Sequence, residues 1–186
     1  SFRVGEDGPT HQPIEHEAQL RLLEQVRNFK GKPSLLALRP GDSEEVRVAW
    51  KMAMDTVDRP TALVFSRQDL VDSVSDNGDR KANAQGVLRG GYVVSGEVAP
   101  KLVLLANGSE LGLAHQTAQK LREEGVATRV VSVPSVGLFL EQDAAYRESV
   151  LPSATPVLAI TAGLSCVFRG LEGPLGEVVC LERFGA

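Results

Sequence analysis

Two residues near the start of the chain are of the types that perform acid–base chemistry. Asp7 and His11 lie within residues 5–13, a segment in which glycine and proline are also concentrated. Glycine lets the backbone turn tightly or approach a ligand closely, and proline stiffens the positions beside it. An imidazole held in such a loop can donate or accept a proton near neutral pH. The pattern indicates a candidate catalytic loop, although a histidine that merely fixes its loop by hydrogen bonds is the commoner source of such a pattern.

A helix is predicted to follow this loop directly. Pro13 suits the first position of a helix, and the helical pattern extends over residues 13–29. The apolar residues at helical spacing are Ile14, Ala18, Leu22 and Val26. A helix N-terminus carries a partial positive charge that favours anions. The His11 loop is therefore expected to lead into a helix end suited to negatively charged groups.

A strand, a helix and a second strand are predicted next. Residues 34–38 and 61–65 are short apolar runs typical of buried strands. Between them, Asp42 is a good N-cap, with Glu45 three residues later. The expected apolar stripe of this helix consists of Val46, Ala49, Trp50 and Ala53. Arg67 follows the second strand, at the C-terminal end where parallel α/β sheets place their ligand groups.

The second half of the chain continues the alternation of strands and helices. Residues 72–91 are polar and glycine-rich and form the best candidate linker. Beyond them, strands are predicted at residues 101–106, 127–132, 156–160 and 177–181, and helices at residues 111–124 and 143–150. Such alternation is typical of a mostly parallel sheet covered by helices. The predicted fold class is α/β, with two αβ units that each have a mostly parallel sheet flanked by helices.

Composition and charge argue against several functional classes. The net charge is −4 and the lysines and arginines are scattered, so no basic face for nucleic acid is indicated. No apolar run approaches the roughly 18 residues of a membrane span, and the start has no signal-peptide features. Cys166 and Cys180 form neither a ligand cluster nor a disulfide pattern. We expect a cytoplasmic protein with no nucleic-acid, membrane or metal partner, and we interpret its Ser1-Phe2 start as that of a piece of something longer.

The nine residues 5–13 read GEDGPTHQP. They resemble the signature of transketolases and match it at every position. Transketolases are thiamine-diphosphate enzymes that move two-carbon ketol units between sugar phosphates. Further segments that resemble the family are residues 38–40, 48–51, 59–63, 66–68, 108–110, 146–152 and 183–186. Together the segments extend over nearly the whole chain.

The resemblance implies how the chain is organised. Residues 1–71 would be the C-terminal part of a pyrimidine-binding domain, residues 72–91 a linker, and residues 92–186 a transketolase C-terminal domain truncated at its end, a three-layer α/β/α unit. The parent enzyme would be a homodimer that uses thiamine diphosphate and Mg²⁺ and acts on ketose and aldose phosphates of the pentose phosphate pathway. Because the diphosphate-binding domain is absent, the isolated chain is expected to be inactive and to bind neither cofactor.

The resemblance also implies roles for three residues. His11 would lie beside the C1 and C2 oxygens of the substrate and exchange protons there. Asp7 would hydrogen-bond a hydroxyl of the donor sugar, while an Asx turn before Gly8 is the structural alternative. Arg67 would hold the terminal phosphate of the sugar with its bidentate guanidinium, the alternative being a solvated surface charge. The family usually has asparagine where this chain has Asp69, which adds a negative charge near the proposed phosphate.

Several other polar segments are assigned no role in the chemistry. His16 and His115 are expected on solvated helix faces, and residues 107–110 are expected to form a turn and a helix cap. Residues 134–140 and 161–176 depart from the family pattern, so no function is transferred to them.

Two other interpretations remain open. One is a related thiamine-dependent enzyme, such as deoxyxylulose-phosphate synthase or a 2-oxo acid dehydrogenase subunit. The Gln12-Pro13 ending and the segment of residues 66–68 disfavour both. The other is a non-catalytic α/β domain that serves in binding or dimerisation.

Overall fold

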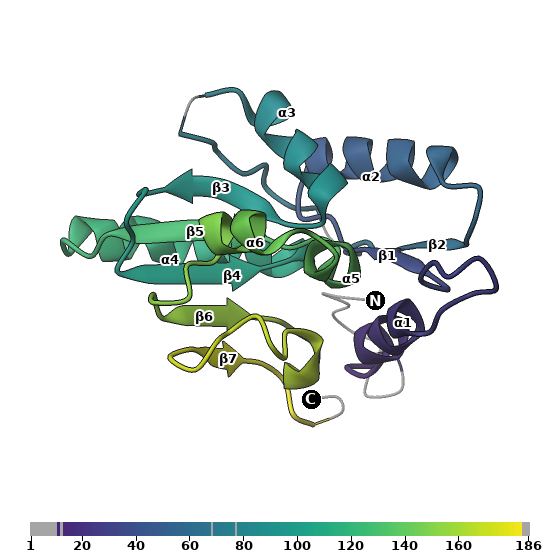
Figure 1. Ribbon diagram of the computed structural model, residues 1–186. Coiled ribbons are helices and arrows are strands. Elements are labelled where there is room, and N and C mark those ends of the chain that lie inside the picture. The colour runs from purple at the N-terminus through teal and green to yellow at the C-terminus, as the bar shows by residue number, and fades with distance from the viewer. Residues whose placement is uncertain (1–10, 12, 68, 77, 184–186) are drawn as a thin grey trace.

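The computed structural model describes residues 11, 13–67, 69–76 and 78–183. These residues form a two-stranded sheet and a five-stranded sheet, with helices on both sides (Figure 1). The carboxyl ends of the larger sheet's parallel strands point toward the N-terminal helix and the smaller sheet (Figure 1). This mixed architecture confirms the predicted α/β fold class.

The N-terminal unit alternates helix and strand. Its elements are α1 (His16–Gln25), β1 (Leu36–Leu38), α2 (Ser43–Asp55) and β2 (Thr61–Leu63). The two strands pair in parallel, with Leu36 opposite Thr61 and Leu38 opposite Leu63. Leu38 is fully buried, whereas all three residues of β2 are only half-buried. The strands lie where the sequence placed them, but the prediction that the second strand is buried was wrong, because all three residues of β2 keep part of their surface exposed.

The five-stranded sheet forms the centre of the C-terminal unit. Its strands are β3 (Tyr92–Gly96), β4 (Leu102–Ala106), β5 (Thr128–Ser132), β6 (Val157–Ile160) and β7 (Glu177–Val179), in the order β3-β5-β4-β6-β7. All neighbours are parallel except β3, which runs antiparallel to β5. Side chains alternate between the two faces, so Leu104 and Val103 enter different core clusters. The sheet is therefore mostly parallel, as its strand and helix pattern predicts.

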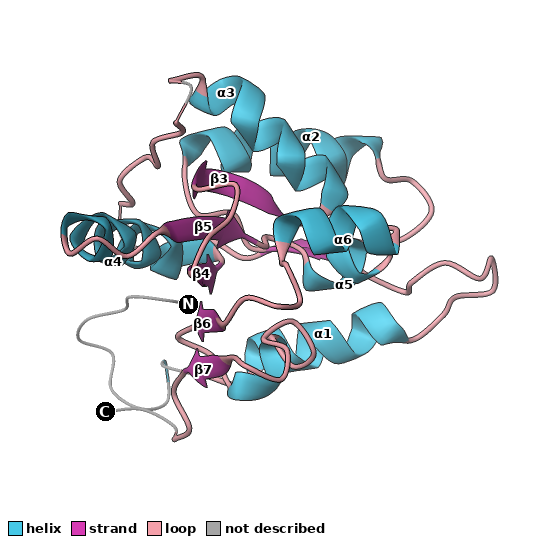
Figure 2. Cartoon of the chain, turned by 60° about the vertical axis from the view of Figure 1, so that its left-hand side comes forward, coloured by secondary structure: helices cyan, strands magenta, loops and turns pink. Residues whose placement is uncertain are grey.

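Helices cover both faces of this sheet. The remaining elements are α3 (Arg80–Asn83), η2 (Ala84–Arg89), η3 (Gly108–Glu110), α4 (Leu111–Glu123), α5 (Val136–Leu140), α6 (Ala144–Val150) and η4 (Ser165–Val167). Figure 2 shows α4 on one side of the stacked strands and α5, α6 and α1 on the other. No helix among the described residues is long and apolar enough to cross a membrane.

The first turn of α2 has the predicted cap. The Asp42 side chain accepts a hydrogen bond of 2.9 Å from the backbone N–H of Glu45. Ala49 is fully buried as expected, but Trp50 is 52% exposed and stacks on Phe65 with ring centroids 6.1 Å apart. The predicted apolar stripe was therefore wrong at Trp50. The buried side of α2 includes Glu45 instead, because polar partners surround its carboxylate.

The helix α1 is shorter than predicted and buries a different face. It begins at His16 and ends at Gln25. Leu22 is 62% exposed and Val26, just after the helix, is 50% exposed, which contradicts their placement on a buried stripe. The buried face includes Glu24, which is only 6% exposed. Hydrophobic spacing failed here because hydrogen bonds to a carboxylate determine which face is buried.

The segment of residues 72–91 is partly helical. Its first part has no helix or strand, whereas residues 80–89 form α3 and η2. Ala84 and Val87 are fully buried in the same core cluster as Val48 and Leu104. This cluster contains residues of both units, so the connection packs into a shared core.

Candidate functional site

The predicted catalytic loop lies mostly outside the described residues. Asp7 lies outside the described residues. His11 is described and exposed. Two residues later, Pro13 begins the approach to α1, so His11 precedes the helix as predicted.

Arg67 lies just beyond the carboxyl end of β2. Its side chain is exposed, and the preceding Ser66 is half-buried. Pairing between the small sheet's strands continues past β2, because the Val64 N–H donates to the Leu38 carbonyl at 2.9 Å. Arg67 therefore lies at the carboxyl-end edge of the small sheet, where ligand groups are expected in parallel α/β sheets.

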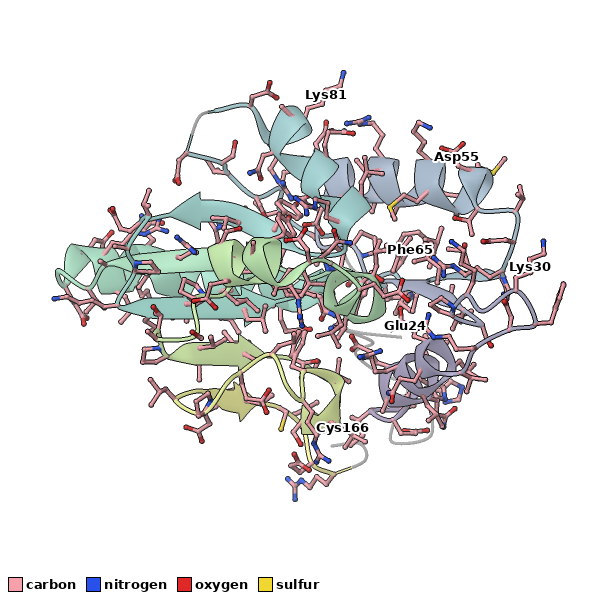
Figure 3. The ribbon with its side chains drawn as sticks, viewed as in Figure 1. Glu24, Lys30, Asp55, Phe65, Lys81 and Cys166 are labelled. Carbon is pink, nitrogen blue, oxygen red and sulfur yellow. The ribbon has the colours of Figure 1, made fainter. Side chains whose placement is uncertain are left out.

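A pocket of about 430 Å³ separates α1 from the end of β2. The residues that line it are Pro13, His16, Glu17, Gln19, Leu20 and Leu23 on one side, and Leu63, Val64 and Phe65 on the other. Figure 3 shows Phe65 between α2 and the small sheet. The structure therefore brings together the segment that follows His11 and the segment that precedes Arg67, while each of these two side chains is itself exposed.

A buried arginine supports the polar side of this pocket. Arg39 follows β1 and is 3% exposed. Its guanidinium donates to Asn107 Oδ1 at 2.6 Å, to Ser109 Oγ at 3.1 Å and to Glu110 Oε2 at 2.5 Å. It also lies 3.3 Å from a carboxylate oxygen of Glu17, a pocket residue. Arg39 thereby links α1 to the carboxyl ends of β1 and β4.

The carboxylate of Glu17 is held in an unusual environment. Burial raises the pKa of Glu17, and the charge of Arg39 and a hydrogen bond from Asn107 Nδ2 oppose this rise. Sequence reasoning missed this network: residues 107–110 were interpreted only as a turn and cap. The available signal was the position of Arg39 and Asn107, each directly after a buried strand, because parallel strands bring such residues to one edge.

Glu24 attaches α1 to both units. Its carboxylate accepts hydrogen bonds from the backbone N–H groups of Ala37 and Gly137, both at 3.2 Å, and from Ser135 Oγ at 3.4 Å. Burial raises the pKa of Glu24, and these donors partly oppose the rise. A Cβ at Gly137 would lie 2.6 Å from Glu24 Cδ, so only glycine fits beside this carboxylate. Figure 3 shows Glu24 on the face of α1 turned toward the rest of the molecule.

Replacing Glu24 with alanine is expected to lower the free energy of unfolding by about 2–3 kcal/mol, because two partly buried backbone donors lose their acceptor. Glu24→Gln keeps one acceptor oxygen and should lose roughly half as much. Urea unfolding of the chain at pH 7 measures both, with the surface variant Glu44→Ala as control. Equal stability of Glu24→Ala and the control would show that this carboxylate does not anchor α1.

The other two histidines differ from each other. His16 is exposed as predicted, with Nε2 3.5 Å from a carboxylate oxygen of Glu15. His115 was expected on a solvated face, but it is half-buried, and burial lowers its pKa. Within the described part of the chain, no histidine, cysteine, aspartate and glutamate side chains are grouped in threes or more so that they could hold a metal ion.

Comparisons with known proteins cover the whole chain. The family model described as the transketolase-like TK C-terminal domain matches residues 90–186, and the model of the transketolase pyrimidine-binding domain matches residues 1–72. The protein named "Transketolase, plasmid" of Cupriavidus necator is 43% identical over 185 residues, which cover 100% of this chain and 26% of that protein.

Solved structures show the same relationship. Transketolase from Leishmania mexicana aligns with a TM-score of 0.81 at 36% identity, covering 98% of this chain and 24% of that one. A transketolase mutant from Pichia stipitis, described as a complex with xylulose 5-phosphate, aligns with a TM-score of 0.81 at 31% identity and the same coverage. The chain therefore spans about a quarter of the length of the relatives it matches.

Proposed function

The chain belongs to the transketolase family, and we propose that it forms one wall of the active site of a longer enzyme. That enzyme would transfer a two-carbon ketol unit from a ketose phosphate to an aldose phosphate. The observation that carries this proposal is the pocket between α1 and β2, which is lined by the segments adjoining His11 and Arg67. The xylulose 5-phosphate complex of the Pichia stipitis relative supports the choice of substrate class.

The proposed organisation follows the two family models. Residues 1–71 would complete a pyrimidine-binding domain, residues 72–91 would connect it, and residues 92–186 would form most of a C-terminal domain. The longer enzyme would be a cytoplasmic homodimer of the pentose phosphate pathway. The hydrogen bonds of Arg39 and Glu24 support one part of this arrangement, because they join the two units through buried groups.

The proposed chemistry assigns proton transfer to His11. Breaking a carbon–carbon bond of the ketose requires a proton to leave a hydroxyl, and forming the new bond requires a proton to reach the aldehyde oxygen. A histidine at the substrate oxygens can perform both transfers. Asp7 would hydrogen-bond a donor hydroxyl and so select its stereochemistry, because a site built to pair with a hydroxyl rejects a sugar that places it elsewhere.

Thiamine diphosphate and Mg²⁺ are the cofactors that the family implies. The described residues do not fit the diphosphate–metal group: the pocket beside α1 is lined by no lysine or arginine, and no cluster of metal-ligating side chains occurs in the described ranges. We propose that other parts of the longer enzyme hold this group and that the 186-residue chain alone is inactive.

Arg67→Ala in the longer enzyme is expected to raise KM for phosphorylated donors by about 10-fold or more, because a charge-assisted contact to the phosphate is lost. The KM for unphosphorylated sugars should stay nearly unchanged. Steady-state kinetics measure the change in KM separately for phosphorylated and unphosphorylated donors. Arg47→Ala, on the outer surface of α2, is the matched control. An equal change in KM for both kinds of donor would show that Arg67 does not bind the phosphate.

One assay separates the proposed function from the other thiamine-dependent reactions. The longer enzyme is given ribose 5-phosphate as acceptor and either xylulose 5-phosphate or pyruvate as donor. Ketol transfer predicts turnover with xylulose 5-phosphate only. Release of CO2 from pyruvate would favour a synthase or a 2-oxo acid dehydrogenase, because both reactions remove the carboxyl group of pyruvate. Neither ketol transfer nor CO2 release would favour a non-catalytic domain.

A further inference from the structure

The first turn of α1 carries a carboxylate to which the proposed chemistry gives no role. Glu17 follows His11 within the same short segment, and its side chain is only 10% exposed. Charged side chains are seldom buried unless they are paired. Burying a carboxylate is unfavourable unless its partners replace the lost water. The partners of Glu17 therefore indicate why an acid occupies this position.

The two polar partners of Glu17 each follow a strand. Asn107 comes directly after β4, and its Nδ2 donates to Glu17 Oε1 at 2.8 Å. Arg39 comes directly after β1, and its Nη1 lies 3.3 Å from Glu17 Oε2. Arg39 Nη1 also donates to Asn107 Oδ1 at 2.6 Å, so the three side chains are all in mutual contact. The first turn of α1 is therefore attached to the carboxyl ends of β1 and β4.

The loop after β6 packs against the same turn. A Cβ at Gly163 would lie 3.3 Å from Glu17 Oε2 and 3.5 Å from the carbonyl oxygen of Ile14. Ile14 itself is buried. The C-terminal unit thus contacts the backbone just after His11 as well as the carboxylate of Glu17.

The position of a catalytic histidine affects its rate strongly, since a displacement of about 1 Å can cost roughly 100-fold. His11 is exposed, so little packing around its own side chain holds it. Pro13, two residues later, lines the same pocket as Glu17. The backbone that carries His11 is therefore anchored on its C-terminal side by Ile14 and Glu17.

We propose that Glu17 is a positioning residue for His11. Its carboxylate, held by Asn107 and Arg39, fixes the first turn of α1 and thereby the imidazole at the substrate oxygens. Through Asn107, the C-terminal unit contributes to proton transfer. This inference rests on the proposed ketol transfer and adds to it a residue that acts through His11.

Glu17→Ala in the longer enzyme is expected to lower kcat for ketol transfer by about 10- to 100-fold, because the imidazole is no longer held in place. The rate is expressed per cofactor-loaded site, so that unfolded enzyme does not contribute. KM for the donor and affinity for thiamine diphosphate should change by less than about 3-fold. Glu123→Ala, at an exposed position at the end of α4, is the control and should keep the wild-type kcat.

An exchange of hydrogen-bond partners tests the contact between Glu17 and Asn107. Asn107→Asp keeps the oxygen that accepts from Arg39 but places a second carboxylate against Glu17, so kcat at pH 8 should fall by about 10-fold or more. Glu17→Gln removes the charge that faces Arg39 and should also lower kcat. The double variant Glu17→Gln/Asn107→Asp reverses donor and acceptor and keeps the net charge. Its kcat should return to within about 3-fold of the wild type.

The His11→Ala background separates positioning from a general structural role. If Glu17 acts through His11, adding Glu17→Ala to His11→Ala should lower kcat by less than about 2-fold, because the group that it positions is already absent. A structural role would lower kcat by the same factor in both backgrounds.

Three results would overturn this inference even when the wild type performs ketol transfer. One is a wild-type kcat for Glu17→Ala. Another is an equal loss of kcat on Glu17→Ala with and without His11. The third is a Glu17→Gln/Asn107→Asp enzyme no more active than its single variants. Absence of ketol transfer by the wild type would instead overturn the proposed function and this inference together.

Discussion

Arg80→Met is expected to lower the free energy of unfolding of the chain by about 3–5 kcal/mol, the typical effect of removing one partner from a buried ion pair. The Arg80 side chain is 10% exposed and lies beside two fully buried carboxylates, Asp42 and Glu45. Its Nε donates to Asp42 Oδ2 at 2.8 Å, and its Nη2 lies 3.2 Å from Glu45 Oε1. Methionine fills similar space, so the expected loss comes mainly from the two carboxylates left without a cation.

This arginine holds the two units of the chain together. Asp42 caps α2, and Glu45 accepts a hydrogen bond of 2.5 Å from the Tyr92 hydroxyl on β3. Asp42 also accepts from the Ser73 N–H at 3.2 Å, which fixes the start of the connection. Removing Arg80 therefore weakens the cap of α2, the connection and the contact with the large sheet together.

The destabilisation caused by Arg80→Met is also expected to depend on pH, through the titration of Glu45. Burial raises the pKa of Glu45, and the neighbouring Asp42 adds to the rise while Arg80 opposes it. Because the folded pKa lies above the unfolded value, the folded state binds more protons, and stability falls as pH rises through the folded pKa. Without Arg80 the folded pKa rises further, so the destabilisation should be smaller at pH 5 than at pH 8.

Urea unfolding of wild type, Arg80→Met, Glu45→Gln and the double variant at both pH values measures these effects. Glu45→Gln should change stability little and should flatten the pH dependence, because it removes the ionisation. The double variant should be more stable than Arg80→Met alone, because it no longer contains the Glu45 carboxylate that Arg80→Met leaves without a cation. If Arg80→Met lowers the free energy of unfolding by less than about 1 kcal/mol, as is typical of an exposed ion pair, the contacts of Arg80 with Asp42 and Glu45 are solvated.

His11→Ala in the longer enzyme is expected to lower kcat by about 10²–10⁴-fold, the usual contribution of a general acid–base residue. Affinity for thiamine diphosphate should change far less, because His11 is proposed to act on substrate oxygens. Steady-state kinetics and cofactor titration measure the two quantities separately.

His115→Gln is the matched control for this variant. His115 is a half-buried histidine of α4 and does not line the pocket between α1 and β2. Its replacement should leave kcat within about 3-fold of wild type, since it is remote from the proposed chemistry. A His11→Ala enzyme with near wild-type turnover would show that this histidine only fixes its loop.

Most of the backbone architecture could be predicted from the sequence. Short apolar runs between helical segments predicted the positions of the strands β1, β2, β4, β5, β6 and β7. The Asp42 cap predicted the start of α2. The strand β3 was missed because Tyr92–Gly96 follows a polar, glycine-rich segment and pairs antiparallel with β5, which strand and helix alternation does not predict. Its position depends on contacts distant in sequence.

The buried charges could not be predicted in the same way. Glu24 and Glu45 occupy helix faces that hydropathy assigns to solvent, and each is stabilised by partners far along the chain. Arg39 lies in a segment that resembles the family, yet its partners Asn107 and Glu110 come from the other unit. A pairwise contact between a charge and a distant donor leaves no periodic signal in a single sequence.

The most direct test of the central claim is ketol transfer by the longer enzyme, followed with xylulose 5-phosphate labelled with ¹³C at C1 and C2 and with ribose 5-phosphate as acceptor. Ketol transfer predicts a seven-carbon ketose phosphate that carries both labels at adjacent positions, together with an unlabelled three-carbon aldose phosphate. Its formation should fall with Arg67→Ala and nearly vanish with His11→Ala. Failure to form the doubly labelled seven-carbon product would contradict the proposed function.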